Sequence, residues 1–174
     1  MMQLTKSEQR ILQYLSSHSE EALYESQIAS GAHISAGSTN QTLKGLLKKE
    51  LLCLSKKGRM NFYSLNYDHP LVRQYKVMQT ITEINGLINR LRPLTSRVIL
   101  FGSCAEGIDS PNSDIDLVIV SSRADEARRL IKRQKTKREI QPLIFDTGEF
   151  IALERKDRPL YERIQKGIIL WKQK

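Results

Sequence analysis

Two aspartates stand two positions apart at the end of the stretch GSCAEGIDSPNSDID, residues 102–116. The run DIDLVIV that begins at Asp114 predicts a β-strand, and residues two apart on a strand point to the same face, so Asp114 and Asp116 lie side by side. Two carboxylates at this spacing repel each other unless a cation neutralises them. Mg²⁺ suits such a pair best, because proteins bind it through one or two carboxylates together with substrate phosphates. The spacing therefore predicts a site for one or two Mg²⁺ ions.

A glycine-serine pair opens the same stretch. Gly102 and Ser103 follow the strand candidate RVILF, and a helix is expected to begin near Ser103. Glycine at such a turn lets a ligand approach the backbone closely. Free N–H groups at the helix start, together with the Ser103 hydroxyl, present hydrogen-bond donors to an anion. The pair therefore predicts a phosphate-binding turn.

The N-terminal part of the chain, residues 1–66, predicts three helices and a hairpin. A capping box from Thr5 to Glu8 begins the first helix, a second is expected over 24–30, and a third runs from the N-cap Ser35 to about Lys49. LLCLS and MNFYSL then form two strands joined by KKGR, where the glycine permits a tight turn. Three helices followed by a basic hairpin resemble a winged helix-turn-helix domain.

The remaining chain predicts a long connecting helix and a small sheet. Apolar residues recur at helical spacing from His69 to Leu91. RVILF, DIDLVIV and EIQPLIF are strand candidates, ADEARRLIKRQKTK is a helix candidate, and 147–171 is expected to be helical with breaks near Pro159 and Gly167. This pattern divides the chain into a winged helix-turn-helix domain, a connecting helix and an α/β domain, at residues 1–66, 67–93 and 94–174.

The motif itself carries a resemblance to a known family. Gly102-Ser103, ten intervening residues and Asp114-Ile115-Asp116 inside FGSCAEGIDSPNSDIDLVIV resemble the signature of the DNA polymerase β-like nucleotidyltransferase superfamily in its minimal form. With the N-terminal part, the chain is similar to prokaryotic proteins that join a winged helix to a minimal nucleotidyltransferase. The resemblance implies an α/β (α+β) nucleotidyltransferase domain, with a small mixed sheet flanked by helices, preceded by a winged-helix domain.

The family would also have a third carboxylate on a neighbouring strand. Glu139, at the start of the strand candidate EIQPLIF, is the best positional candidate, and Asp146 at its other end is a poorer one. A slip of one residue in the alignment would place Gln141 there instead. The residues that the resemblance assigns to catalysis and to the metal are therefore Asp114, Asp116 and Glu139.

The resemblance implies a Mg²⁺-dependent transfer of a nucleoside monophosphate. Gly102 and Ser103 would hold the β and γ phosphates of a nucleoside triphosphate, with ATP expected as the donor. Glu139 would help to ligate a second Mg²⁺ and draw the proton from an acceptor hydroxyl, whose oxygen attacks the α-phosphorus while pyrophosphate leaves. The acceptor is a hydroxyl on a protein, a nucleic acid or a small molecule, and in related minimal nucleotidyltransferases it can be a partner protein.

Two positions depart from the family pattern. Cys104 and Glu106 stand where arginine is frequent, so a positive charge that would meet the triphosphate is missing. This departure keeps a second function open. In that alternative the chain is a DNA-binding transcriptional regulator whose nucleotidyltransferase-like domain senses nucleotide without catalysis.

The charge of the chain favours polyanionic partners. The net charge is +9, and both ends of the chain are basic while the middle is neutral. On the third helix and the hairpin, polar and basic residues are suited to base edges and phosphates of a duplex. The residues predicted to contact duplex DNA are Thr39, Asn40, Gln41, Lys44, Lys56, Lys57 and Arg59.

Each pattern also has a purely structural alternative. The two aspartates can simply begin a strand from a polar turn, with both carboxylates in water. The winged helix can serve a homodimer while its polar face is solvated. The basic run from Arg128 to Arg138 is typical of a solvated helix face, with an acidic or nucleic-acid acceptor as its other use.

Composition predicts a cytoplasmic protein with no membrane partner. No apolar run approaches the ~20 residues that span a bilayer, and the first residues carry no apolar stretch typical of a signal peptide. The two cysteines, Cys53 and Cys104, have neither CxxC nor Cys/His spacing, so neither a disulfide framework nor a zinc site is predicted.

Overall fold

The computed structural model describes residues 4–18 and 21–173. The chain forms two compact units that divide between Arg73 and Gln74. The division falls inside the long helix, so most of that helix belongs to the C-terminal unit. The three domain ranges drawn from the sequence remain a prediction. In the part of the chain that is described, no helix is both long and apolar enough to cross a bilayer.

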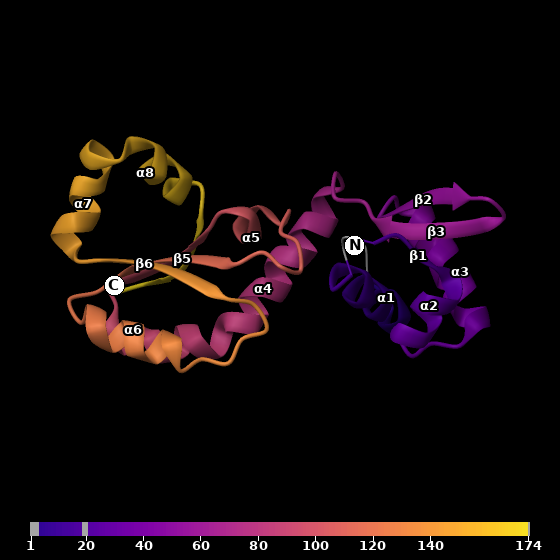
Figure 1. Ribbon diagram of the computed structural model, residues 1–174, viewed down its shortest axis with the longest axis horizontal. Coiled ribbons are helices and arrows are strands. Elements are labelled where there is room, and N and C mark those ends of the chain that lie inside the picture. The colour runs from indigo at the N-terminus through magenta and orange to yellow at the C-terminus, as the bar shows by residue number, and fades with distance from the viewer. Residues whose placement is uncertain (1–3, 19–20, 174) are drawn as a thin grey trace. The chain divides into compact units, whose positions relative to one another are not determined.

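The N-terminal unit contains three helices and a three-stranded antiparallel sheet (Figure 1). Its elements are α1 (Lys6–Ser16), β1 (Leu23–Tyr24), α2 (Glu25–Gly31), α3 (Ala36–Lys48), β2 (Leu52–Lys57) and β3 (Met60–Leu65). The strands are ordered β1-β3-β2, and β2 and β3 form the predicted hairpin. This succession of elements is a winged helix, and the fold predicted for this part is confirmed. The short strand β1 was not predicted.

The predicted capping box begins α1. Thr5 accepts a hydrogen bond from the Glu8 backbone, and the Glu8 side chain accepts one from the Thr5 backbone. The Glu8 carboxylate is buried and also lies 2.6 Å from the Nζ atom of Lys49, just after α3. One side chain therefore both caps a helix and ties α1 to the end of α3. The three helices bury Ile11, Leu15, Ile28, Leu43 and Leu46 between them.

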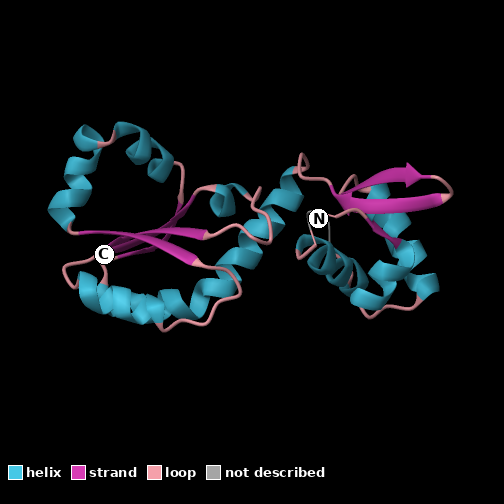
Figure 2. Cartoon of the chain, in the orientation of Figure 1, coloured by secondary structure: helices cyan, strands magenta, loops and turns pink. Residues whose placement is uncertain are grey.

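The C-terminal unit is a four-stranded mixed sheet with helices on both faces (Figure 2). Its elements are α4 (Pro70–Leu91), a 3₁₀ turn (Arg92–Leu94), β4 (Arg97–Phe101), α5 (Ser103–Glu106), β5 (Ile115–Val120), α6 (Ala124–Lys132), β6 (Ile140–Phe145), α7 (Thr147–Lys156), α8 (Arg158–Gln165) and β7 (Ile168–Lys172). The strand order is β6-β5-β4-β7, in which β5 and β6 are parallel and the other pairs antiparallel. The predicted fold class, a small mixed sheet flanked by helices, is confirmed.

Two predicted elements are wrong in extent or type. The helix α6 ends at Lys132, although its basic sequence continues the helical pattern to 137. The segment predicted to stay helical to Trp171 ends instead in the strand β7, which pairs with β4. The run IILWK is rich in β-branched and aromatic residues, and it gains ladder hydrogen bonds at the open edge of β4. The sheet therefore has four strands rather than three.

Alternating residues of the central strands pack into two separate cores. On one face, Ile115 and Leu117 of β5 join a cluster that includes residues of α4 and α6. On the other face, Val118 and Val120 pack with residues of α7 and α8. Figure 1 shows α4 and α6 below the sheet and α7 and α8 above it. Because residues two apart share a face, Asp116 lies on the α7/α8 face.

Candidate active site

The two halves of the motif meet where β4 ends beside the start of β5. In the antiparallel pair, Phe101 is opposite Asp116, so the next residue, Gly102, lies beside the Asp116 side chain. Gly102 has a φ of 69°, and a Cβ atom at this position would lie 2.4 Å from the Oδ2 atom of Asp116. Only glycine avoids this collision. The missing side chain at Gly102 therefore makes room for the Asp116 carboxylate, a role that the sequence did not predict.

Burial and charge act together on Asp116. The side chain is half-buried, and its burial raises the pKa above the usual aspartate range. The positive charge of Arg163 acts in the opposite direction, and the negative charge of exposed Asp114 raises the pKa further. Asp114 is therefore one of the charges that act on Asp116.

The neighbouring strand places a glutamine level with Asp116. In the parallel pair of β5 and β6, Asp116 is the partner of Gln141. The Nε2 atom of Gln141 donates a hydrogen bond of 3.4 Å to the Oδ2 atom of Asp114. Glu139 is exposed, lies one residue before β6, and accepts a hydrogen bond from Ile115 through its backbone oxygen. The position beside the two aspartates is therefore occupied by an amide.

No group of three His, Cys, Asp or Glu side chains suited to a metal ion occurs within residues 4–18 and 21–173. The role of Glu139 as a third ligand stays a prediction. Asp146, the poorer candidate, caps α7, because its Oδ1 atom accepts a 2.7 Å hydrogen bond from the backbone of Glu149. The acidic pair of Asp114 and Asp116 is thus the part of the predicted set that the fold brings together.

A cation from the C-terminal part of the chain lies near this pair. The Cζ atom of Arg163, on α8, is 5.8 Å from the ring centroid of Phe101, the residue opposite Asp116. Its charge lowers the pKa of Asp116, as described above. Arg163 was not among the predicted site residues, because α8 lies far along the chain from the motif and no local sequence pattern indicates that the two are close in space.

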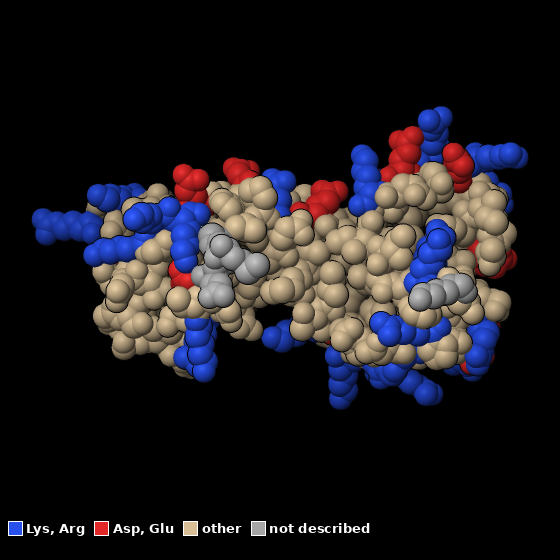
Figure 3. All heavy atoms as spheres, turned by 180° about the vertical axis from the view of Figure 1, so that it is seen from behind, with Lys and Arg blue, Asp and Glu red and all other residues tan. Residues whose placement is uncertain are grey.

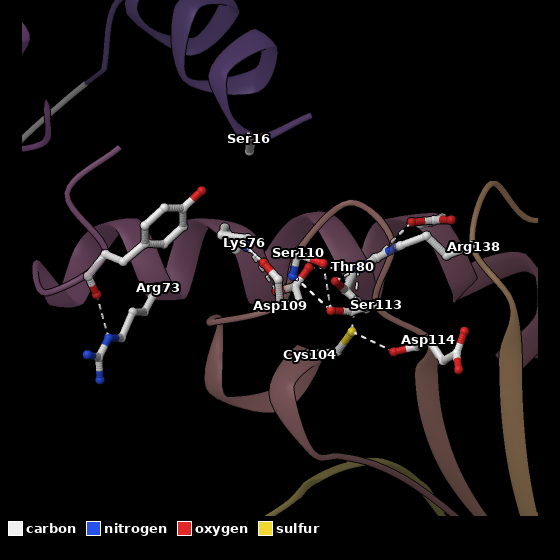
Figure 4. Close-up of polar contacts among 12 residues, drawn as sticks. Ser16, Arg73, Lys76, Thr80, Cys104, Asp109, Ser110, Ser113, Asp114 and Arg138 are labelled. Carbon is white, nitrogen blue, oxygen red and sulfur yellow. Dashed lines mark hydrogen bonds and ion pairs between the residues drawn. The ribbon is translucent and has the colours of Figure 1, made fainter. Parts of the chain in front are cut away.

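A buried network of charges supports the loop between α5 and β5. The guanidinium of Arg138 lies 2.7 Å from the Oδ2 atom of Asp109, 2.8 Å from the hydroxyl of Thr80 and 3.0 Å from the Oε2 atom of Glu83. The Nζ atom of Lys76 is 3.3 Å from the Oδ1 atom of Asp109. Figure 4 shows Arg138 with its partners Asp109 and Thr80, and Lys76 beside Asp109. Arg138 therefore belongs to a buried network and not to the solvated basic face that its sequence context indicates.

Cys104 connects that network to the motif. Its Sγ atom donates a hydrogen bond to the backbone oxygen of Asp114 at 3.3 Å and accepts one from Arg138 at 3.4 Å. In Figure 4 the Asp114 carboxylate points away from these contacts. Burial, assisted by the charge of Asp109, raises the pKa of the thiol to about 11, so it stays protonated and is no nucleophile at neutral pH. Cys104 is a core residue that positions Asp114, and Glu106 is exposed.

The winged helix exposes most of the residues predicted to contact DNA. Gln41 and Lys44 are exposed on α3, whereas Asn40 is half-buried and donates a hydrogen bond of 2.9 Å to Glu25. On the hairpin, the exposed basic residues are Lys56, Lys57 and Arg59. Figure 3 shows Lys and Arg side chains projecting around this unit.

Thr39 is the exception among these residues. It is fully buried, and its hydroxyl donates a hydrogen bond of 3.0 Å to the backbone oxygen of Ser35. The prediction that Thr39 contacts DNA is therefore corrected, because its side chain faces the core of the unit. The polar residues around it in the sequence gave no indication of this orientation.

Comparisons with known proteins found one family model and several solved structures. A family model described as a nucleotidyltransferase domain matches residues 81–170. No curated protein sequence matches. Solved structures that are similar include a mutant of Staphylococcus aureus MepR bound to an oligodeoxyribonucleotide, at 19% identity and a TM-score of 0.40, covering 50% of this chain and 62% of that one.

Two further structures are similar at comparable levels. The zinc-responsive MarR family member ZitR of Lactococcus lactis has 23% identity and a TM-score of 0.36, with coverage of 51% of this chain and 64% of that chain. The archaeal chromatin protein TrmBL2 has 15% identity and a TM-score of 0.33, with coverage of 90% and 71%. The chain thus spans less than two thirds of the length of the MepR mutant and of ZitR.

The raised pKa of Asp116 predicts a pH-dependent cost to stability. The fold disfavours the ionised carboxylate, so ionisation of Asp116 lowers the free energy of unfolding, and this loss is complete at neutral pH. The loss disappears as the pH falls through the raised pKa toward the ordinary aspartate value of roughly 4. Asp116→Asn removes the charge and keeps the shape. We expect this variant to unfold at a modestly higher temperature than the wild type at neutral pH in EDTA, since solvent screens a half-buried group.

Calorimetric unfolding scans between about pH 7 and pH 4.5 measure this difference. The advantage of Asp116→Asn should shrink as pH falls. Asp125→Asn, at an exposed carboxylate on α6, is the matched control and should show no such advantage at neutral pH. An advantage of Asp116→Asn that stays constant across this range would contradict the electrostatic explanation.

Proposed function

The chain belongs to the nucleotidyltransferase domain family, and we propose that its C-terminal unit transfers a nucleoside monophosphate from a nucleoside triphosphate, with ATP as the first candidate, to a hydroxyl acceptor. One observation carries the proposal. The carboxylate of Asp116 lies against the backbone of Gly102, and this contact supports a site built from the acidic pair and the glycine-serine turn. Acidic metal ligands beside a phosphate-binding turn are what this reaction needs.

The residues present fit Mg²⁺. Asp114 and Asp116 offer hard carboxylate oxygens whose mutual repulsion a divalent cation would relieve. Burial raises the pKa of Asp116, and the charge of Asp114 adds to that effect. When bound, Mg²⁺ supplies charge neutralisation for the triphosphate and the attacking oxygen. Asp114 and Asp116 would hold it.

The other steps are phosphate binding by the glycine-serine turn and removal of a proton from the acceptor. Gly102 and Ser103 bind the β and γ phosphates, and this grip orients the α-phosphorus. The acceptor oxygen forms a bond to that phosphorus, the bond to the bridging oxygen breaks, and pyrophosphate departs with the electron pair. Glu139 takes the proton from the acceptor hydroxyl. The acceptor is a protein, a nucleic acid or a small molecule.

One observation favours a second candidate function. Gln141 is level with Asp116 on the neighbouring strand, and a neutral amide neither accepts the proton nor adds charge for a second metal ion. The candidate is a regulator that binds DNA through its winged helix and senses a nucleoside triphosphate through the C-terminal unit without transferring it. Binding without turnover is its defining property.

Transfer of label from α-labelled ATP tests the first function. The full chain is mixed with Mg²⁺, α-labelled ATP and a panel of protein, nucleic-acid and small-molecule hydroxyl acceptors, and both labelled product and pyrophosphate are measured. Asp114→Asn with Asp116→Asn should lower the rate by at least about 100-fold, because metal ligands are lost. Asp125→Asn is the control and should transfer as the wild type does. Equal transfer by the double variant would refute these roles.

Gln141→Asp separates the two candidates in the same assay. A carboxylate at position 141, which is level with Asp116, adds a negative charge beside the pair to that of Glu139, so a transferase should gain rate, by about tenfold or more. If the wild type binds ATP with Mg²⁺ but releases no pyrophosphate with any acceptor, the sensing function is the correct one. Asp114→Asn with Asp116→Asn should then lose that binding.

For the N-terminal unit we propose duplex DNA as the partner. Gln41, Lys44 and Lys48 are exposed at spacings of three and four residues along α3, which places them on one face of the helix. The hairpin of this unit exposes Lys56, Lys57 and Arg59, whose positive charges can contact the phosphates of a duplex whose base edges this face of α3 contacts. Base contacts would come from α3 and phosphate contacts from the hairpin.

The salt dependence of DNA binding checks this assignment. Replacing Lys56, Lys57 and Arg59 by Gln removes up to three phosphate contacts, so the slope of log affinity against log salt should become less steep by up to about three. Fluorescence anisotropy with a labelled duplex at several salt concentrations measures the slope. Lys156→Gln, on α7, is the control. Unchanged slopes in the hairpin variant would exclude the hairpin from the interface.

A further inference from the structure

We infer that Arg163 is the cation that binds the phosphates of the nucleotide in this site. The inference rests on the proposed function, because it supposes that a nucleoside triphosphate occupies the turn at Gly102 and Ser103. It adds a residue from α8 to a site that is otherwise built from the motif alone.

The site needs a positive charge that the motif does not supply. A triphosphate carries several negative charges, and the acidic pair adds more. Cys104 is buried and donates a hydrogen bond to the backbone of Asp114, and Glu106 is an exposed carboxylate, so neither supplies a positive charge. A bound Mg²⁺ would balance only part of this charge. A side chain from outside the stretch 102–116 therefore has to provide the rest.

Arg163 lies on the correct face of the sheet. Phe101 and Asp116 are opposite each other in the β4–β5 pair, and their side chains share the face that α7 and α8 cover. The guanidinium carbon of Arg163 is 5.8 Å from the centroid of the Phe101 ring. Gly102 directly follows Phe101, so the cation contacts the residue that precedes the turn proposed to bind phosphate.

The backbone at Arg163 is held firmly against β4. Ile164, the next residue, is buried in the core under α7 and α8. After α8 the chain turns at Gly167, where a Cβ atom would lie 2.6 Å from the backbone oxygen of Leu100. Ile168 then pairs with Leu100 in the β4–β7 ladder. The position of residue 163 is therefore tied to the same strand that ends in Gly102.

The guanidinium is also available for a ligand. Arg163 is exposed, and it forms no ion pair with any carboxylate among the described residues, whereas Arg158 on the same helix pairs with Glu162 at 3.0 Å. An arginine presents a planar fork of donors that matches phosphate oxygens, so it suits this role better than lysine.

Calorimetric titration of the full chain with ATP at saturating Mg²⁺ tests the inference. Arg163→Gln should weaken ATP binding by about tenfold or more, because a charge-assisted hydrogen bond is lost. Arg163→Lys should retain part of the affinity. Arg158→Gln, on the same helix, should bind as the wild type does. ATP binding by Arg163→Gln within about twofold of the wild type would overturn the inference.

A second titration, with Mg²⁺ alone, separates phosphate binding from a structural role. If Arg163 acts on phosphate, Arg163→Gln leaves Mg²⁺ binding unchanged or strengthens it, because a competing cation near Asp116 is removed. Weakened binding of both Mg²⁺ and ATP would mean that Arg163 only positions Asp116, and the inference would be wrong. If the wild type itself binds no ATP with Mg²⁺, the proposed function fails, whereas equal binding by wild type and variant refutes only the role of Arg163.

Discussion

The close approach of the Asp116 carboxylate to the backbone of Gly102 is the constraint on which the site depends. It exists because β4 and β5 pair so that Phe101 is opposite Asp116. The next residue must then lack a side chain, since a Cβ atom would lie 2.4 Å from the carboxylate oxygen. The glycine of the turn and the second aspartate are thus one structural unit, although ten residues separate Ser103 from Asp114.

Buried side chains of the C-terminal unit hold the loop that leads to this contact. Arg138, Asp109 and Lys76 form a buried network beneath the loop that leads to Asp114, and Cys104 connects that loop to α5. Breaking such a network by removing one partner is costly, because it leaves a buried charge uncompensated. The ionised form of Asp116 is destabilised, since burial and the charge of Asp114 raise its pKa. A carboxylate whose pKa is shifted by burial and by neighbouring charges is typical of a ligand-binding site.

Local sequence patterns predicted the features that depend on neighbouring residues. The capping box at Thr5, the hairpin glycine and the two-residue spacing of the aspartates each act within a few positions, and the mixed sheet flanked by helices follows from the succession of strand and helix patterns. Local patterns could not predict the features that depend on strand register or tertiary packing. Gln141 is level with Asp116 because β5 and β6 pair in one particular register, and Thr39 is buried because α3 turns that face inward. No local pattern reports the approach of Arg163 to β4.

In the proposed site, Asp114 and Asp116 together hold a divalent cation beside the turn at Gly102. Anomalous diffraction from crystals soaked with Mn²⁺ and a non-hydrolysable ATP analogue tests it directly, because Mn²⁺ accepts the same oxygen ligands as Mg²⁺ and marks its own position. We expect a peak between the two carboxylates, with the phosphates of the analogue against Gly102 and Ser103. Ordered analogue with no peak between these carboxylates, or a peak bound elsewhere, would contradict it.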